Sequence, residues 1–172
     1  VIAAGRLIAG DDGGVHRSED LGDSWVNLND GLGTAQFYAG LSTSSADPDI
    51  VIGGLQDNGT SLRRGPMIEW DSVLGGDGGW TQIDQQRPHR MFGESQGTGN
   101  LARSVDSGRS WNGIGSGLSG RNCFLPPYLI DPVNPDRMLY ATHRIHESTD
   151  GGNSWSVIST DLTDGSGAIR AL

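Results

Sequence analysis

SVDSGRSW, residues 104–111, is the stretch that determines how this chain folds. It holds a serine, an aspartate, a glycine, a small hydroxyl residue and a tryptophan at fixed offsets, and the same offsets recur in SEDLGDSW at 18–25 and STDGGNSW at 148–155. A motif used three times is more typical of a scaffold than of a catalytic site. Its defining residues are Ser18, Asp20, Gly22 and Trp25; Ser104, Asp106, Gly108 and Trp111; and Ser148, Asp150, Gly152 and Trp155.

The spacing of this box shows that the chain is built from repeats. The three box serines lie 86 and 44 residues apart, and 86 is twice 43, so a further copy is expected near residue 61. SLRRGPMIEW at 61–70 meets this expectation in altered form, because it keeps a serine, Gly65 and Trp70 but lacks the aspartate and is two residues longer. Four repeats of 43–44 residues therefore account for the chain.

Each repeat alternates short apolar and polar runs with Gly, Asp, Asn or Pro between them, which is typical of antiparallel strands joined by turns. Glycine supplies 28 of 172 residues, which also disfavours helix. Four strands in about 40–45 residues match a propeller blade. The predicted fold is an all-β propeller of about four blades, either a partial propeller or half of a larger ring. The predicted repeats are 1–33, 34–78, 79–118 and 119–160, with 167–172 as the first strand of a further or seam blade.

Within the box, side chains and backbone have distinct predicted roles. Asp106 is placed to accept backbone N–H bonds inside a hairpin turn, and Gly108 can adopt the positive φ that such a turn demands. Trp111 is expected to pack between neighbouring repeats. The three box carboxylates cannot converge on one substrate, because each is displaced by at least one blade. The box is therefore predicted to be structural.

Composition excludes several classes of function. Lys and Arg total 12 against 21 Asp and Glu, and the resulting net charge of -9 repels nucleic acid. Cys123 is the single cysteine, so neither a disulfide framework nor a cysteine metal site is expected. No apolar run reaches the ~20 residues of a membrane span, and the opening VIAAGRLIAG lacks the features of a secretory signal. No cofactor is expected.

The boxes resemble the Asp-box, or bacterial neuraminidase repeat (BNR). GDDGGVHRSED, GGLQDNGT, GGDGGW and DPVNPDRMLYATHRIHESTDGGNSW resemble the wider group of secreted BNR/YVTN-like repeat proteins, which includes sortilin-type propellers and xyloglucan-specific endoglucanases. The resemblance covers nearly the whole chain. It implies a secreted or periplasmic location and a glycan or protein ligand.

Binding residues are expected in the loops that do not repeat, since loops vary without disturbing stacked sheets. Gln56, Asp57 and Asn58 follow a strand, Asp77 stands among four glycines, and Trp80 comes just after it. Amide and carboxylate groups there would bond sugar hydroxyls, and Trp80 would stack on a sugar ring. The structural alternatives are a hairpin turn at Asn58-Gly59, a plain loop at Asp77 and a core position for Trp80. The first hypothesis is a non-enzymatic module that binds glycan or protein.

The alternative hypothesis is glycoside hydrolysis. Asp11 in DDGG and Asp77 in GDG are similar to the two catalytic aspartate segments of xyloglucan-active propellers, and glycosidases of the common type pair two carboxylates. In that family the aspartates come from two facing propellers, which one short segment does not supply. A sialidase is not predicted, because the Arg-Ile-Pro signature and an evident arginine triad are lacking.

Two further hypotheses concern metals and assembly. His143 and His146 are three apart on a predicted strand, so they point to opposite faces and are expected to be solvated rather than to chelate an ion. Asp11 and Asp12 provide oxygen ligands for Ca²⁺ but belong to no spaced ligand set, and no metal site is assigned. A homodimer that completes an eight-bladed ring is the third, structural hypothesis.

Overall fold

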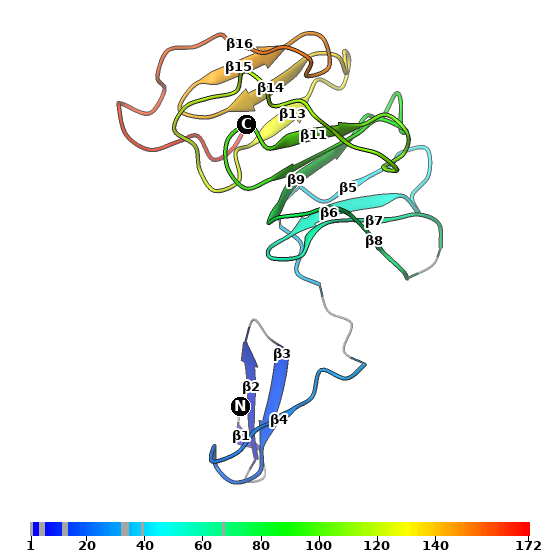
Figure 1. Cartoon of the computed structure of the whole chain (residues 1–172), viewed down its shortest axis with the longest axis vertical. Coiled ribbons are helices and arrows are strands. Elements are labelled where there is room, and N and C mark those ends of the chain that lie inside the picture. The colour runs from blue at the N-terminus through cyan, green and yellow to red at the C-terminus, as the bar shows by residue number, and fades with distance from the viewer. Residues whose placement is uncertain (1, 4–5, 12–13, 32–34, 39, 67) are drawn as a thin grey trace. The chain divides into compact units, whose positions relative to one another are not determined.

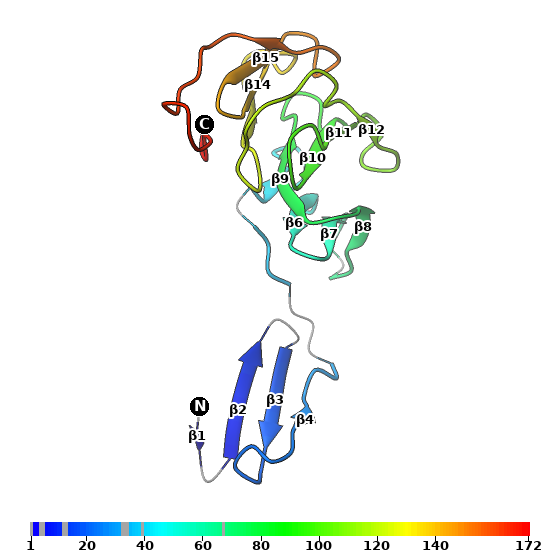
Figure 2. The ribbon, with the colours of Figure 1, turned by 60° about the vertical axis from the view of Figure 1, so that its left-hand side comes forward.

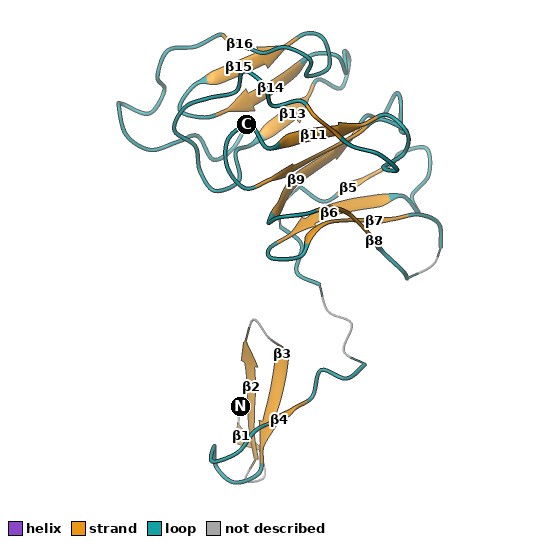
Figure 3. Ribbon diagram, viewed as in Figure 1, coloured by secondary structure: helices purple, strands orange, loops and turns teal. Residues whose placement is uncertain are grey.

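The computed structural model describes residues 2–3, 6–11, 14–31, 35–38, 40–66 and 68–172. The chain divides into two compact units, residues 1–35 and 36–172. In the described residues, sixteen strands form four four-stranded antiparallel sheets, and no helix is present (Figures 1 and 3). The predicted all-β architecture of four-stranded blades is confirmed.

The first unit contains one sheet, in the order β1-β2-β3-β4. Its strands are β1 (Ile2–Ala3), β2 (Arg6–Asp11), β3 (Gly14–Ser18) and β4 (Val26–Asn27). Ile2 pairs with Leu7, so this blade has its own first strand. The predicted repeat boundary at 33/34 lies outside the described residues.

The second unit contains three sheets, each with its strands in chain order. Their faces pack against one another in succession (Figure 2). The strands are β5 (Ser42–Thr43), β6 (Val51–Leu55), β7 (Gly59–Arg63) and β8 (Asp71–Leu74); β9 (Gly78–Ile83), β10 (Met91–Ser95), β11 (Leu101–Ser104) and β12 (Asn112–Gly113); β13 (Tyr128–Ile130), β14 (Met138–Ala141), β15 (Ile145–Ser148) and β16 (Ser156–Val157).

The apolar core lies between successive sheets. One buried cluster joins β5–β8 to β9–β12 through Ile52, Leu62, Ile83 and Met91, and Trp111 packs against it. A second cluster joins β9–β12 to β13–β16 through Phe92, Leu101, Ile114, Leu118, Tyr128, Met138 and Tyr140, and Trp155 packs against it. The predicted packing of the box tryptophan between repeats is confirmed, and it explains why one blade needs its neighbour.

The box forms a self-contained turn. Ser104 Oγ accepts the backbone N–H groups of Gly108 at 2.8 Å and Asp106 at 3.3 Å, and it donates to Asp106 Oδ1 at 2.7 Å. Asp106 also accepts the backbone N–H groups of Arg109 at 3.1 Å and Ser110 at 2.9 Å. Gly108 has φ 79°, as predicted. The side chains of the box serine and aspartate are thus bonded within eight residues.

The boxes at 18–25 and 148–155 have the same bonds, with Gly22 and Gly152 each donating to the box serine at 2.8 Å. The hydroxyl and N–H of Ser110, followed by the Ser104 hydroxyl, hold the pKa of Asp106 well below its usual value. The same bonds from Ser154 and Ser148 lower the pKa of Asp150 to about 2. The box carboxylates therefore stay ionised and serve as acceptors for the turn.

The altered box of the second blade begins two residues later than predicted. Val51 pairs with Arg63, whereas the equivalent Met91 and Met138 pair with the box serines Ser104 and Ser148. Arg63 therefore occupies the serine position, and the span from Arg63 to Trp70 has the normal eight residues without an insertion. Sequence spacing alone selected Ser61 because it preserves a serine, but strand register places the turn at Arg63.

A second polar turn lies at the same end of the blades as the boxes, because alternate turns of an antiparallel sheet share one end. We call this the turn end. Arg90 is buried there, and it bonds Asp84 Oδ2 at 2.9 Å and Asp136 Oδ1 at 2.6 Å. Arg87 bonds the same two carboxylates. Since Asp84 follows β9 and Asp136 precedes β14, these four residues connect the third blade to the fourth.

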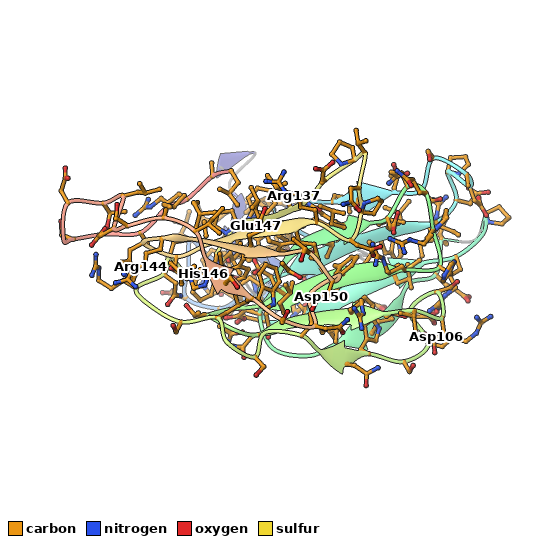
Figure 4. The ribbon with its side chains drawn as sticks, turned by 90° about the horizontal axis from the view of Figure 1, so that it is seen from above. Asp106, Arg137, Arg144, His146, Glu147 and Asp150 are labelled. Atoms are coloured by element: carbon orange, nitrogen blue, oxygen red, sulfur yellow. The ribbon has the colours of Figure 1, made fainter. Side chains whose placement is uncertain are left out.

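The turn end is also bonded from blade to blade and along each blade. Arg103 Nη1 donates to Gly151 O at 2.7 Å, linking β11 to the next box. In the fourth blade Arg137 bonds Glu147 at 2.7 Å, and both residues are labelled in Figure 4. Each of these exposed bonds contributes little to the free energy of unfolding, but together they connect neighbouring turns and strands.

Residues 167–172 do not form the predicted strand. The segment instead makes a single backbone bond to the end of the fourth sheet, where Ile169 N donates to Thr142 O at 2.9 Å. One isolated bond does not constitute a ladder, because strand pairing needs a partner strand along its length. The segment therefore lies over the loops of the fourth blade rather than in a sheet.

Candidate functional site

The end of the blades opposite the boxes carries the loops that do not repeat, and we call it the loop end. The β6–β7 loop at 56–58, the β8–β9 connection at 75–77 and the β10–β11 loop at 96–100 meet there. Gln96 N donates to Asp77 O at 3.1 Å, and Gly97 N donates to Phe124 O at 3.0 Å. Backbone bonds thus join loops of three successive blades.

The β6–β7 loop differs from the predicted Asn58-Gly59 turn. Leu55 pairs with Gly59, so the loop has the three residues Gln56, Asp57 and Asn58 rather than two. Asp57 takes the left-handed conformation with φ 61°, and Asn58 Nδ2 bonds Gln56 O at 3.0 Å. The side chain of Gln56 bonds the Tyr38 hydroxyl. The loop is therefore a turn that also presents an amide next to an aromatic ring.

Asp77 connects two blades. Its Oδ1 accepts the backbone N–H of Asp57 at 2.7 Å, and its own N–H donates to Gln96 Oε1 at 3.0 Å. Asp57, Asp77 and Gln96 come from separate loops, so this bonding sets the spacing of the loop end. The carboxylate that the sequence identified is thus at least a positioning group for the loops around it.

Most of the glycines around Asp77 have a packing reason. A Cβ on Gly54 would overlap Gly79, and a Cβ on Gly78 would overlap the carbonyl oxygen of Gly59. The backbone of β6 therefore approaches that of β9 more closely than side chains allow. Gly76 has φ 81°, which the loop requires, whereas a Cβ on Gly75 would meet nothing. The glycine cluster is accounted for without assigning it a ligand.

A hollow of about 400 Å³ opens among these segments. Three aromatic side chains line it, Tyr38, Trp80 and Phe124, together with Arg170, Cys123 and Leu125. Tyr38 N donates to Gly54 O at 2.9 Å, which fixes the first ring beside β6, and Phe124 is 51% exposed. The volume lies in the range of ordinary ligand sites, roughly 300–1,000 Å³.

Trp80 occupies the core position that the structural alternative predicted, while its stacking on a sugar ring stays a prediction. It packs against the core between the third and fourth blades and also lines the hollow. Tyr38, Phe124 and Arg170 were missed by the sequence analysis. A signal for two of them was present, because Tyr38, Trp80 and Phe124 are 42 and 44 residues apart, close to one repeat. Arg170 had no such signal.

Glu94 was also missed, and it is buried beside the hollow. It is 1% exposed, its Oε1 accepts the Trp80 N–H at 3.3 Å, and its Oε2 has no partner among the described residues. Burial raises the pKa of Glu94 to about 9, against the smaller opposing effect of the Trp80 N–H. The Glu94 side chain is therefore neutral at pH 7, and it holds the backbone of Trp80 through this hydrogen bond.

Asp11 lies in the first unit and Asp77 in the second. Asp11 ends β2, where it pairs with Gly14, and its Oδ1 lies 3.5 Å from His16 Nε2. Asp12, the other acidic residue of that segment, lies outside the described residues. Pairing of Asp11 with Asp77 as acid and base stays a prediction.

His143 and His146 are buried, not solvated as predicted. They are 8% and 1% exposed, and His146 Nε2 lies 3.2 Å from Thr142 Oγ1. Burial lowers the pKa of His146. The fourth sheet is covered here by the 119–120 loop, which the alternation pattern did not reveal. In the described residues no group of three or more His, Cys, Asp and Glu is arranged to hold a metal ion.

Comparisons with known proteins support the fold. No protein-family model matches the chain. A structure of an ancestral GH74 enzyme superposes with a TM-score of 0.62 at 15% identity, covering 91% of this chain and 23% of that one. YCF48 bound to D1 peptide superposes with a TM-score of 0.53 at 15% identity, covering 95% and 53%. The fold is that of a β-propeller. At these identities the likeness concerns the fold alone.

One curated protein is similar in sequence. A probable oligoxyloglucan-reducing end-specific xyloglucanase of Neosartorya fischeri is 33% identical in an alignment 132 residues long that covers 66% of this chain. The match spans 16% of that protein's length. The propeller is therefore GH74-like in fold, and part of its sequence is similar to that probable xyloglucanase. Within the described residues, no helix has the length and apolar character needed to cross a bilayer.

Proposed function

We propose that this propeller binds a saccharide in the hollow at its loop end and does so without catalysis. The observation that carries the proposal is the hollow lined by Tyr38, Trp80 and Phe124, with the Gln56 amide beside the first ring. Apolar faces of sugar rings pack on aromatic rings, while a few polar groups fix their orientation by bonding the hydroxyls. Asp57, Asn58 and Asp77 are proposed to hold this arrangement and to border the ligand.

The test is calorimetric titration with xyloglucan, xylan and β-glucan oligosaccharides. Phe124→Ala is expected to weaken binding up to about tenfold, since aromatic pairs contribute ~0.5–1.5 kcal/mol. Val133→Ala is the control, because Val133 is an exposed apolar side chain (84%) in a turn at the other end of the blades. Absence of binding to every oligosaccharide would refute the proposal, and binding of peptides instead would favour a protein ligand, as in the YCF48 complex with D1 peptide.

A second candidate is glycoside hydrolysis with Asp11 and Asp77 as the two carboxylates. The similarity to a probable xyloglucanase favours it. Asp77→Asn should then abolish release of reducing sugar from xyloglucan. The isosteric change keeps an oxygen for the Asp57 N–H, so loss of activity without loss of folding would indicate chemistry. An inactive unmodified chain would exclude this candidate for the segment alone.

Assembly and location remain predictions. A homodimer that completes a ring follows from the number of blades, and a secreted or periplasmic location follows from the resemblance to secreted repeat proteins. Light scattering over a range of concentrations tests the dimer, and a monomer at every concentration would exclude it.

A further inference from the structure

The basic side chains of this chain are nearly all used in internal bonds. All twelve are arginines, and ten of them bond a carboxylate or a backbone carbonyl. The other two are Arg144 and Arg170, whose side chains make no hydrogen bond or ion pair with another described residue. The ten bonded ones are Arg6, Arg17, Arg63, Arg64, Arg87, Arg90, Arg103, Arg109, Arg121 and Arg137.

Arg170 is held at the hollow by its own segment. Cys123 Sγ lies 3.4 Å from Ile169 O, and Ile169 N donates to Thr142 O at 2.9 Å. These bonds place the residue before Arg170 against the wall of the hollow, and the Arg170 side chain lines it. The position of this cation thus follows from contacts of the folded chain.

No lining residue neutralises this charge. The hollow is lined by Tyr38, Trp80, Cys123, Phe124, Leu125 and Arg170, none of which is a carboxylate. The carboxyl group of Glu94 accepts the Trp80 N–H, but burial raises its pKa and keeps it protonated and uncharged at pH 7. In a chain of net charge -9, this leaves one locally positive, aromatic-lined hollow.

We propose that the hollow selects saccharides that carry a carboxylate, namely hexuronate units, and that Arg170 determines this specificity. The inference rests on the saccharide binding proposed above and names its substrate class. A guanidinium matches a carboxylate with two parallel N–H···O bonds, while the sugar ring that bears the carboxylate lies against the aromatic side chains. A neutral sugar would leave the guanidinium with only water and hydroxyl partners.

The experiment compares two ligands that differ in one group. The first is a xylose oligosaccharide with one glucuronate branch, and the second is the same molecule after reduction of its carboxyl group to an alcohol. Calorimetric titration is expected to show at least tenfold tighter binding of the acid. Arg170→Gln should weaken binding of the acid far more than binding of the reduced ligand, and so remove that difference. Arg144→Gln, which removes the other unbonded cation, should change neither affinity.

The outcomes separate this inference from the proposed function. Equal binding of acid and reduced ligand would overturn the hexuronate preference and leave saccharide binding intact. A preference that survives Arg170→Gln would overturn the role of Arg170. Binding of neither ligand, or binding of an acidic peptide alone, would overturn both proposals. Because Arg170 is exposed, thermal melts of the variant should match the unmodified chain, so a failed fold does not obscure the result.

Discussion

The turn end and the loop end of the blades satisfy their polar groups in different ways. At the turn end, each box bonds its serine, aspartate and glycine within eight residues, and the same bonds recur in three blades. At the loop end, bonds run between loops of different blades, as from Asp57 to Asp77 and from Gly97 to Phe124. Glu94 Oε2, which has no hydrogen-bond partner in the described part of the chain, lies near that end.

This difference separates scaffold from site. In each box the serine hydroxyl and the aspartate carboxylate are engaged inside the turn, so they are not available to a ligand and the box can be repeated without functional cost. Loops that depend on neighbouring blades differ from one another, and they leave Phe124 and Arg170 open to solvent at a hollow. Changes at the turn end should therefore affect stability, and changes at the hollow should affect binding.

The largest expected effect is at Arg90, which joins the third and fourth blades. Arg90→Met leaves the fully buried Asp84 with only Arg87 as a charged partner, so the free energy of unfolding should fall by about 3 kcal/mol. Urea unfolding measures it. Arg137→Met is the control, and its exposed pairs should cost under about 1 kcal/mol. Equal losses in both variants would contradict a special role for the buried cluster.

Glu94 makes stability depend on pH. Its pKa is about 9 when folded and about 4.5 when unfolded, so the folded chain binds the extra proton between these values. The contribution of this protonation to the free energy of unfolding is complete below pH 4.5. It is lost as the pH rises from there through 9, at about 1.4 kcal/mol per pH unit. Glu94→Gln should therefore become less destabilising, or stabilising, relative to the unmodified chain from pH 7 to pH 9. Parallel profiles would show that Glu94 is not protonated.

Ser104→Ala tests the self-contained turn. The change removes the acceptor of the Gly108 N–H, which is buried, and should cost about 1–3 kcal/mol in unfolding free energy. Ser116→Ala is the control, since Ser116 is exposed in a loop. If Ser104→Ala lowers the free energy of unfolding by less than about 0.5 kcal/mol, water replaces the hydroxyl and the box serine does not stabilise the fold.

The smallest expected stability effect is at the hollow. Phe124→Ala should change the free energy of unfolding by no more than about 0.5 kcal/mol, because the ring is half exposed, although it weakens saccharide binding. Thermal melts and titration of the same preparation provide both values. A stability loss comparable to that of Ser104→Ala would place Phe124 in the scaffold and erase the contrast between the two ends.

The parts predicted well from sequence are those whose bonds are local. The turn role of Asp106, the positive φ of Gly108 and the packing of Trp111 all follow from residues 104–111 and the repeat period. Errors arose where register or burial depends on other strands. The spacing predicts Ser61 as the box serine, but Val51 pairs with Arg63, so the turn begins two residues later.

Local sequence patterns also failed to predict which side chains are buried and which loops lie next to each other. His143 and His146 were expected to be solvated on opposite faces of a strand, yet packing against the 119–120 loop buries both. The sequence located the loop of Gln56, Asp57 and Asn58. It did not show that Tyr38, 18 residues earlier in the chain, bonds the Gln56 side chain. Each of these features depends on a contact between residues that are far apart in sequence or on separate elements.

By itself the sequence determined the repeat, the four-stranded blade and the box turn, because hydrogen bonds within a few residues and a period of 43–44 residues suffice for them. The tertiary structure alone decided the hollow. It collects Tyr38, Trp80, Phe124 and Arg170 from segments one repeat apart, and it buries Glu94 behind them. Such convergence depends on how blades stack, and stacking is set by packing across sheets rather than by any single stretch of chain.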